Sequence, residues 1–396
     1  MQDGNLHISR IVSGIQMSAI KKMAMRSAGT EGAVSLAWGV PSFETPLHIR
    51  AAVERELESD PDIGKYSLPD GLTELRELAA ARHRRATGID ADPDENLMIT
   101  AGNTQGINAL LHVLIDPGDE VIVTDPGFAS HIQQTRLCGG TPVYWAMDEA
   151  RGWALDVDAL GELVTARTKA IVLVSPSNPT GKIFSENELR RIGDIALARN
   201  LIILVDDPYS HFTYDNRDRF FNLASVEALK DNLVYMFTFS KAFAMSGWRL
   251  AYMVAPAWLK QQLLKVHDST IICAPRISQV AGIAALKEEV HQLRGFEEAL
   301  AGRRRLICER LDAVSHVFQY VRPEGAYYVF PKILATHSTS VDFAIRLLDE
   351  AGVAVTPGSA FGPAGEHHLR MAYCVDEDTI NLAFDRIEVC FGRTTS

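Results

Sequence analysis

A lysine and an arginine stand eight residues apart in the segment Thr238–Arg249, directly after a short apolar run. Lys241 is flanked by phenylalanine and methionine residues, and apolar surroundings disfavour the charged form of an amine, which makes it available as a nucleophile. Arg249 offers a fork of donors that suits a phosphate dianion, and the hydroxyls of Thr238 and Ser240 are close in sequence. Taken alone, this pattern is equally typical of a solvated lysine and a surface arginine.

Side chains that do chemistry need a rigid scaffold, and the middle of the chain predicts one. Short runs that are apolar on both faces are typical of a buried, mainly parallel sheet. The predicted strands are Leu97–Thr100, Val121–Thr124, Ala170–Ser175, Leu201–Val205, Leu233–Thr238 and Leu250–Val254. Helical patterns lie between them, for example Gln105–Ile115 and Glu186–Arg199, and Ser185 could cap the second. Strand and helix in alternation indicate an α/β fold with its ligand site at the carboxyl ends of the strands.

The pattern changes from about Glu288 onward. Long charged helices are predicted at Gln292–Ala313 and Val341–Ala351, with short strands near Ala326–Phe330 and His368–Tyr373. We interpret this part as a smaller α+β domain that the N-terminal segment completes. The expected division is an N-terminal segment of residues 1–45 packing on the small domain, a large domain of 46–287 and a small domain of 288–396.

Composition excludes several classes of protein. The chain has 396 residues with 39 Lys+Arg and 50 Asp+Glu, a formal net charge of −11, which argues against a nucleic-acid binder. Its five cysteines form no C-x-x-C pair, and no stretch reaches the roughly 18 apolar residues of a membrane span, so we expect a cytoplasmic protein without membrane contact. His367 and His368 lack a third ligand, and we expect no metal.

The segment Thr238–Arg249 resembles the cofactor-lysine segment of the fold-type I, class I/II aminotransferases, which use pyridoxal 5′-phosphate. Further segments resemble motifs of this family and follow in its order: Leu36–Pro46, Lys65–Arg76, Thr100–Gln105, Pro117–Val121, Ser175–Gly181, Val205–Tyr209, Pro323–Tyr328 and Pro357–Gly362. The run Arg10–Ile20 resembles the subgroup of aspartate, aromatic and alanine aminotransferases. The resemblance implies the aspartate-aminotransferase-like fold, with helices on both sides of the large sheet.

The resemblance also implies catalytic roles. Lys241 is the cofactor lysine and moves the proton at the substrate Cα. Asp206 keeps the cofactor's ring nitrogen protonated, which an electron sink requires. Asn178 and Tyr209 donate to the phenolic oxygen of the cofactor, and Phe128 stacks on its ring.

Phosphate, substrate and assembly are assigned in the same way. The implied phosphate site consists of the backbone N–H groups at a helix start together with a guanidinium and hydroxyls, that is, of Gly102, Asn103, Thr104, Arg249, Thr238 and Ser240. Arg370 grips the substrate α-carboxylate, with Gly39 and Asn178 against the substrate. Tyr66 reaches the phosphate of a neighbouring subunit, which implies a homodimer with composite sites. His131 departs from the family, which often has another aromatic there.

The function implied is transfer of the amino group of an L-amino acid, with aspartate or an aromatic amino acid favoured, to a 2-oxo acid such as 2-oxoglutarate by a ping-pong mechanism. One alternative is a pyridoxal-phosphate-dependent lyase on the same scaffold, of the C–S β-lyase or aminocyclopropane-carboxylate-synthase type, since function resides in the site and not in the fold. Another is a pyridoxal-binding regulator, but we expect the short stretch before Val34 to leave no room for a helix-turn-helix module.

Overall fold

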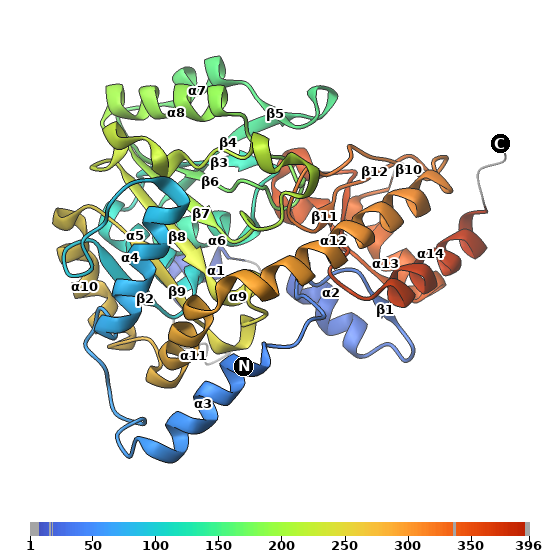
Figure 1. Cartoon of the computed structure of the whole chain (residues 1–396). Coiled ribbons are helices and arrows are strands. Elements are labelled where there is room, and N and C mark those ends of the chain that lie inside the picture. The colour runs from blue at the N-terminus through green and yellow to red at the C-terminus, as the bar shows by residue number, and fades with distance from the viewer. Residues whose placement is uncertain (1–7, 16, 18, 336–337, 393–396) are drawn as a thin grey trace, which may run out of the picture.

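An eight-stranded sheet forms the centre of the molecule (Figure 1). The computed structural model describes residues 8–15, 17, 19–335 and 338–392, without the side chains of 289–292. In spatial order the strands are β2 (Leu97–Thr100), β9 (Ala251–Val254), β8 (Leu233–Thr238), β7 (Ile202–Asp207), β6 (Thr168–Leu173), β3 (Glu120–Asp125), β4 (Thr141–Asp148) and β5 (Ala154–Leu155).

The sheet is mainly parallel, as predicted. Strands β8, β7, β6, β3 and β4 run parallel, whereas β9 is antiparallel to both β8 and β2 and β5 is antiparallel to β4. The sequence analysis missed β4. This strand lies near one edge of the sheet and several of its residues are half-buried, so it lacks the continuous apolar run by which the other strands were predicted.

Helices cover both faces of the sheet. Ile171 and Leu173 point into one core and Val172 into the other, because successive side chains of a strand face opposite sides. The first core contains residues from α3 (Leu47–Ser59), α4 (Thr73–Thr87), α7 (Val157–Leu163), α8 (Glu186–Arg199) and α11 (Arg276–Lys287). The second contains residues from α5 (Asn103–Leu114), α6 (Ala129–Leu137) and α10 (Ala257–Ile271).

Local signals set the ends of these helices. The predicted cap of α8 is confirmed: the Ser185 side chain accepts from the N–H of Glu188, and the Glu188 carboxylate accepts from the N–H of Ser185. The prediction for α5 was wrong at its start, which lies at Asn103 and not at Gln105. Gly102 is the N-cap residue of this helix and has a φ of 79°. The helix therefore begins only three residues after Thr100, the last residue of β2.

A separate apolar core lies beside the large sheet, under the long helix that crosses the molecule in Figure 1. Its helices are α2 (Ala19–Ala28), α12 (Glu289–Asp312), α13 (Ser340–Ala351) and α14 (Glu377–Phe391). Strands β11 (Tyr328–Val329), β15 (Leu369–Ala372) and β14 (Thr356–Pro357) form an antiparallel sheet, β10 (Phe318–Gln319) pairs with β12 (Lys332–Ile333), and β1 (Val34–Ser35) runs parallel to β13 (Val353–Ala354).

Several boundaries of this part differ from the prediction, most of them by a single residue. The helix expected from Gln292 begins at Glu289, and the strand expected at Ala326–Phe330 is only Tyr328–Val329. Ala326 has a φ of 57°, a left-handed conformation that cannot continue a strand. Residues 1–7, Gln16 and Ser18 of the expected N-terminal segment, and 336–337 and 393–396 of the expected small domain, lie outside the described residues.

Candidate active site

A cavity of about 240 Å³ opens at the carboxyl ends of the central strands. Every residue that the sequence singled out as a site residue lines it, except Gly102 and Tyr66. The lining consists of Ile20, Gly39, Asn103, Thr104, Phe128, Val174, Asn178, Asp206, Pro208, Tyr209, Thr238, Ser240, Lys241, Ser246, Arg249, Tyr328 and Arg370. Segments from both ends of the chain therefore meet at one edge of the sheet, where ligands of open α/β sheets bind.

Lys241 lies on the one-turn helix α9 (Phe239–Ala242), which directly follows β8. Its Nζ donates a hydrogen bond to the carbonyl oxygen of Gly39 at 2.6 Å. Desolvation, with a smaller contribution from the positive charges of Arg370 and Arg249, lowers the pKa of this amine to about 8, although Cys374 and Asp206 act in the opposite direction. A substantial fraction of the amine is therefore neutral near physiological pH.

Asp206 ends up between two polar side chains near the end of β7. Its Oδ1 accepts from Asn103 Nδ2 at 2.5 Å, and its Oδ2 lies 2.9 Å from Nε2 of His131. All three side chains are buried. The sequence analysis assigned Asn103 only through its backbone and treated His131 as a departure from the family. The sequence did hold a signal for His131, which stands three residues after Phe128, a spacing that places two side chains on one face of a helix. In the structure the two rings meet edge to face, with their centres 5.2 Å apart.

Arg249 faces the start of α5. It follows the short turn Ser246–Trp248 with a φ of 53°, and its Nη1 donates to the carbonyl oxygen of Ser246 at 2.9 Å. The φ of 79° at Gly102 favours glycine, and a Cβ on Gly102 would lie only 2.4 Å from Nη2 of Arg249, so the guanidinium would have to move. Gly102 thus belongs to this corner although it does not line the cavity.

Hydroxyls complete the same corner. Thr238 caps α9, with its side chain accepting from the N–H of Ser240 and its Oγ1 lying 2.9 Å from Oγ of Ser240. N–H groups in the first turn of a helix, a guanidinium and two hydroxyls are what an anion such as phosphate binds. The N–H of Gly102 itself donates to the carbonyl oxygen of Thr100 at 2.8 Å, so the first turn offers the N–H groups of Asn103 and Thr104. The geometry is that of an anion site.

Arg370, in β15, is buried and lines the same cavity. Its Nη2 donates to the carbonyl oxygen of Ala37 at 2.5 Å and its Nη1 to Oδ1 of Asn178 at 3.3 Å. The guanidinium carbon lies 4.6 Å from the centre of the Tyr328 ring. Its Nε finds no acceptor among the residues that the structure describes, so donor capacity remains for an anionic ligand.

Two tyrosines close the cavity beside Asn178. The hydroxyl of Tyr209 lies 2.9 Å from that of Tyr328, and burial holds the pKa of Tyr209 well above its ordinary value. Both therefore remain neutral donors. The sequence analysis quoted Tyr328 within a motif but gave it no role. A Cβ on Gly39 would lie 2.0 Å from the Tyr328 hydroxyl, which is why this wall needs glycine.

Tyr66 stands apart from the residues that line the cavity. It lies on the loop between α3 and α4, and 73% of it is exposed. The sequence analysis did not single out Ile20, Val174, Pro208 or Ser246, which line the cavity from the N-terminal helix α2 and from loops. No local sequence pattern predicted that Ile20 lines the cavity, because α2 reaches the site only through the packing of the folded chain.

The charges of the cavity suit one kind of ligand. Lys241, Arg249 and Arg370 bring basic groups to its lining, and Asp206 brings one carboxyl group. Oδ1 of Asn103 is buried without a hydrogen-bond partner within the described part of the chain. An anion that also carries a protonated ring nitrogen, as pyridoxal phosphate does, satisfies this arrangement. The described residues contain no group of three potential metal ligands and no helix long and apolar enough to cross a membrane.

Comparison with known proteins agrees with this fold and site. Residues 31–387 match the family described as aminotransferase class I and II, and the chain belongs to this family. It is an aminotransferase, since enzymes with that name resemble it over most of its length.

The relatives act on different amino acids by name. The aspartate aminotransferase of Pyrococcus abyssi and the aromatic-amino-acid aminotransferase 2 of Thermococcus litoralis are each 35% identical to this chain, over 94% of it and 95% of their own length. The solved structure of an aromatic aminotransferase from Pyrococcus horikoshii OT3 matches with a TM-score of 0.87 at 34% identity, covering 94% of this chain and 98% of that one.

Proposed function

We propose that this aminotransferase uses pyridoxal 5′-phosphate to move the amino group of an L-amino acid, with aspartate or an aromatic amino acid favoured, to a 2-oxo acid such as 2-oxoglutarate by a ping-pong mechanism. One observation carries the proposal. The buried amine of Lys241, with its pKa lowered to about 8, lies in one cavity with Asp206 and two arginines. The bound cofactor would supply the electron sink that accepts the electrons released when the substrate Cα loses its proton.

Lys241 moves the proton. Its Nζ would hold the cofactor in the absence of substrate. The free amine would act as the base that removes the proton from the substrate Cα and as the acid that returns it. A base whose pKa lies near the working pH does both steps well, and the lowered pKa of Lys241 supports this role.

Asp206 holds a proton on the cofactor's ring nitrogen. The two hydrogen bonds with Asn103 and His131 fix the orientation of its carboxyl group. We assign both as positioning residues. Asn178 and Tyr209 donate to the phenolic oxygen, for which a neutral amide and a neutral phenol are suited, and Phe128 stacks on the ring.

The two arginines divide the anionic groups between them. Arg249 takes the phosphate, together with the N–H groups of Asn103 and Thr104 and the hydroxyls of Thr238 and Ser240, while Gly102 leaves room for the guanidinium. Arg370 takes the substrate α-carboxylate. Its unpartnered Nε and the nearby Gly39 and Asn178 support this assignment. Binding at both ends orients the Cα–H bond toward Lys241, which lowers the entropic part of the barrier.

Assembly and organisation form part of the proposal. Tyr66 is exposed on its own chain, and we assign it to the phosphate site of a second copy, so that the active form is a homodimer. We divide the chain into a large domain of 46–287, a small domain of 288–396 and an N-terminal segment of 1–45 on the small domain. The pairing of Val34 with Val353 and the presence of Met23 in the separate apolar core beside the large sheet support this division. The scattered cysteines support a cytoplasmic location.

The test is the visible absorption spectrum of the protein loaded with pyridoxal phosphate, recorded as single L-amino acids are added without any 2-oxo acid. Loss of the cofactor's visible band with formation of the matching 2-oxo acid, in a single turnover, supports the proposal and identifies the donor. Release of pyruvate and ammonia with many turnovers would instead mean a lyase. A protein that shows no band after addition of pyridoxal phosphate would refute the cofactor assignment.

A further inference from the structure

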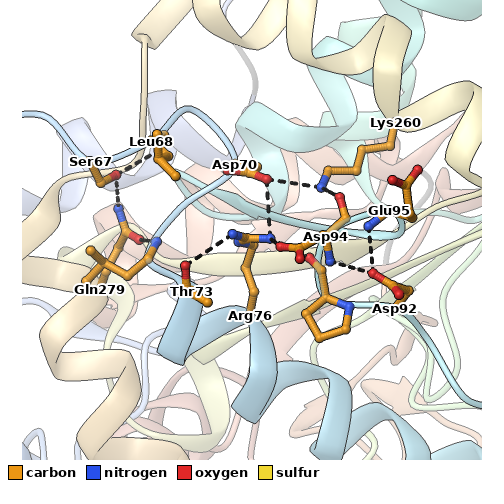
Figure 2. A network of polar contacts seen from close by, with 12 residues as sticks. Ser67, Leu68, Asp70, Thr73, Arg76, Asp92, Asp94, Glu95, Lys260 and Gln279 are labelled. Atoms are coloured by element: carbon orange, nitrogen blue, oxygen red, sulfur yellow. Dashed lines mark hydrogen bonds and ion pairs between the residues drawn. The ribbon is translucent and has the colours of Figure 1, made fainter.

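The loop that carries Tyr66 is held by two buried cations, whereas the carboxylates that they contact are 18% exposed at Asp70 and 76% exposed at Asp94 (Figure 2). Oδ2 of Asp70 lies 3.1 Å from Nζ of Lys260 and 3.4 Å from Nη1 of Arg76. The two cationic side chains are each only 4% exposed. Two buried cations from different helices, α10 and α4, therefore converge on one carboxylate of the loop.

The cations also connect the loop to the strand that leads to the active site. Arg76 donates to the carbonyl oxygen of Pro93 at 2.7 Å and to Oδ1 of Asp94 at 2.5 Å, and Lys260 donates to the carbonyl oxygen of Asp94. Pro93 and Asp94 directly precede β2. In addition, the N–H of Ile99 in β2 donates to the carbonyl oxygen of Asp70 at 2.9 Å.

A second anchor lies nearer to Tyr66. Gln279 of α11 is fully buried, and its Nε2 donates to Oγ of Ser67 at 2.9 Å while its Oε1 accepts from the N–H of Leu72 at 2.7 Å. Figure 2 shows these contacts beside the Asp70 cluster. The residue that follows Tyr66 is thus tied to the same helix that packs against α3 and α4.

Such anchoring has a cost and needs a reason. Burying charges is expensive, and buried ion pairs are weak stabilisers of a fold although the loss of one partner is strongly destabilising. Exposed loops normally rely on short turns and are mobile. This network instead fixes the loop that carries the exposed phenol of Tyr66. Fixing a binding group in advance removes the entropy that its ordering would cost on binding.

We propose that Asp70 and Gln279 are positioning residues that fix the 60–72 loop so that Tyr66 is presented, already ordered, to the cofactor site of a second copy of this chain. The inference rests on the proposed role of Tyr66 in a composite site. Asp70 and Gln279 act only through Tyr66 and touch neither cofactor nor substrate.

The test is a double-mutant cycle read out as the affinity of the dimeric apoprotein for pyridoxal phosphate, titrated by its visible absorbance. Tyr66→Phe should weaken binding roughly tenfold, as expected for one hydrogen bond to a charged group. Asp70→Asn and Gln279→Leu should each weaken it severalfold. In the Tyr66→Phe background the same two substitutions should change affinity no further, because the group they position is already lost.

A second readout does not need the cofactor. Amide hydrogen exchange of residues 60–72 in the apoprotein should accelerate about tenfold or more in both anchor variants, without a matching change in α8. The control is Glu120→Gln, which removes another buried, paired carboxylate at the amino end of β3. It should lower stability yet leave cofactor affinity and loop exchange as in the wild type.

The outcomes separate the two levels of the argument. Equal losses of affinity in the wild-type and Tyr66→Phe backgrounds, or unchanged loop exchange, would overturn the positioning role and leave the composite site intact. An unchanged affinity in Tyr66→Phe itself would refute the composite site, and with it the purpose assigned to the anchored loop.

Discussion

Nε2 of His131 lies 2.9 Å from Oδ2 of Asp206, and both side chains are buried at the carboxyl ends of the central strands. The imidazole therefore fixes one carboxylate oxygen while Asn103 fixes the other. A hydrogen bond to a charged group is worth about 1.5–3 kcal/mol. The orientation of the Asp206 carboxyl group thus depends on two side chains, from α5 and α6, that are distant from it in the sequence.

His131→Phe should reduce kcat roughly tenfold or more, because the carboxylate loses an oriented donor and holds the proton on the cofactor nitrogen less well. His131→Asn, which keeps a donor, should retain more of the rate. The pH profile of kcat and the cofactor absorption spectrum check the cause, since a loss of folding alone would leave both unchanged in shape. Wild-type kcat in His131→Phe would contradict the role.

Lys241 should react with pyridoxal phosphate at a pH where ordinary lysines are inert. Burial lowers its pKa to about 8, so the rate of cofactor capture by the apoprotein should rise with pH through a midpoint near 8. Stopped-flow absorbance measures this rate. Lys241→Ala should lose the fast phase and all transamination, whereas substitution of the exposed Lys265 should change neither. A midpoint near 10 would mean that the amine is solvated.

Gly102→Ala should weaken cofactor binding more than its effect on folding explains. The added Cβ would lie 2.4 Å from Nη2 of Arg249, and the φ of 79° strains any other residue by about 1 kcal/mol or more. Gly118→Ala is the matched control, because its φ of 95° brings the same kind of strain but its Cβ would meet nothing within 4 Å. Equal cofactor affinities in the two variants would contradict the close contact between Gly102 and Arg249.

Asp125 should make the protein less stable as the pH rises. Its carboxylate accepts from the N–H of Ala364 at 3.0 Å, and burial raises its pKa from 3.8 to about 6. Because the folded state then binds the proton more tightly than the unfolded state, stability is present below about pH 4 and is lost as the pH rises through 6. The loss is up to about 3 kcal/mol, from a shift of about two pKa units.

Asp125→Asn keeps an acceptor for Ala364 and does not titrate. The difference in urea-denaturation free energy between this variant and the wild type should therefore grow in favour of the variant from pH 4 to pH 7. The exposed Asp231→Asn should show no such trend. A difference that is constant across this range would show that folding does not raise the pKa of Asp125.

Much of the fold follows from patterns that are local in the chain. Runs that are apolar on both faces predicted the buried parallel strands β3, β6, β7 and β8, because only strands covered by helices on both sides show them. The capping box at Ser185 predicted the start of α8. Strand β4 was missed since its residues are only partly buried, and the antiparallel direction of β9 has no local signature, because direction is set by the connection and not by composition.

For the candidate site, the sequence by itself determined which residue types were available, and the resemblance of its motifs to the aminotransferase family indicated roles for Lys241, Asp206 and Arg370. The fold decided their partners. That His131 contacts Asp206, that Tyr328 contacts Tyr209 and that the Asp70 cluster anchors the loop of Tyr66 depends on side chains far apart in sequence. Such contacts arise only when separate elements pack, since distance along the chain carries no information about which faces meet.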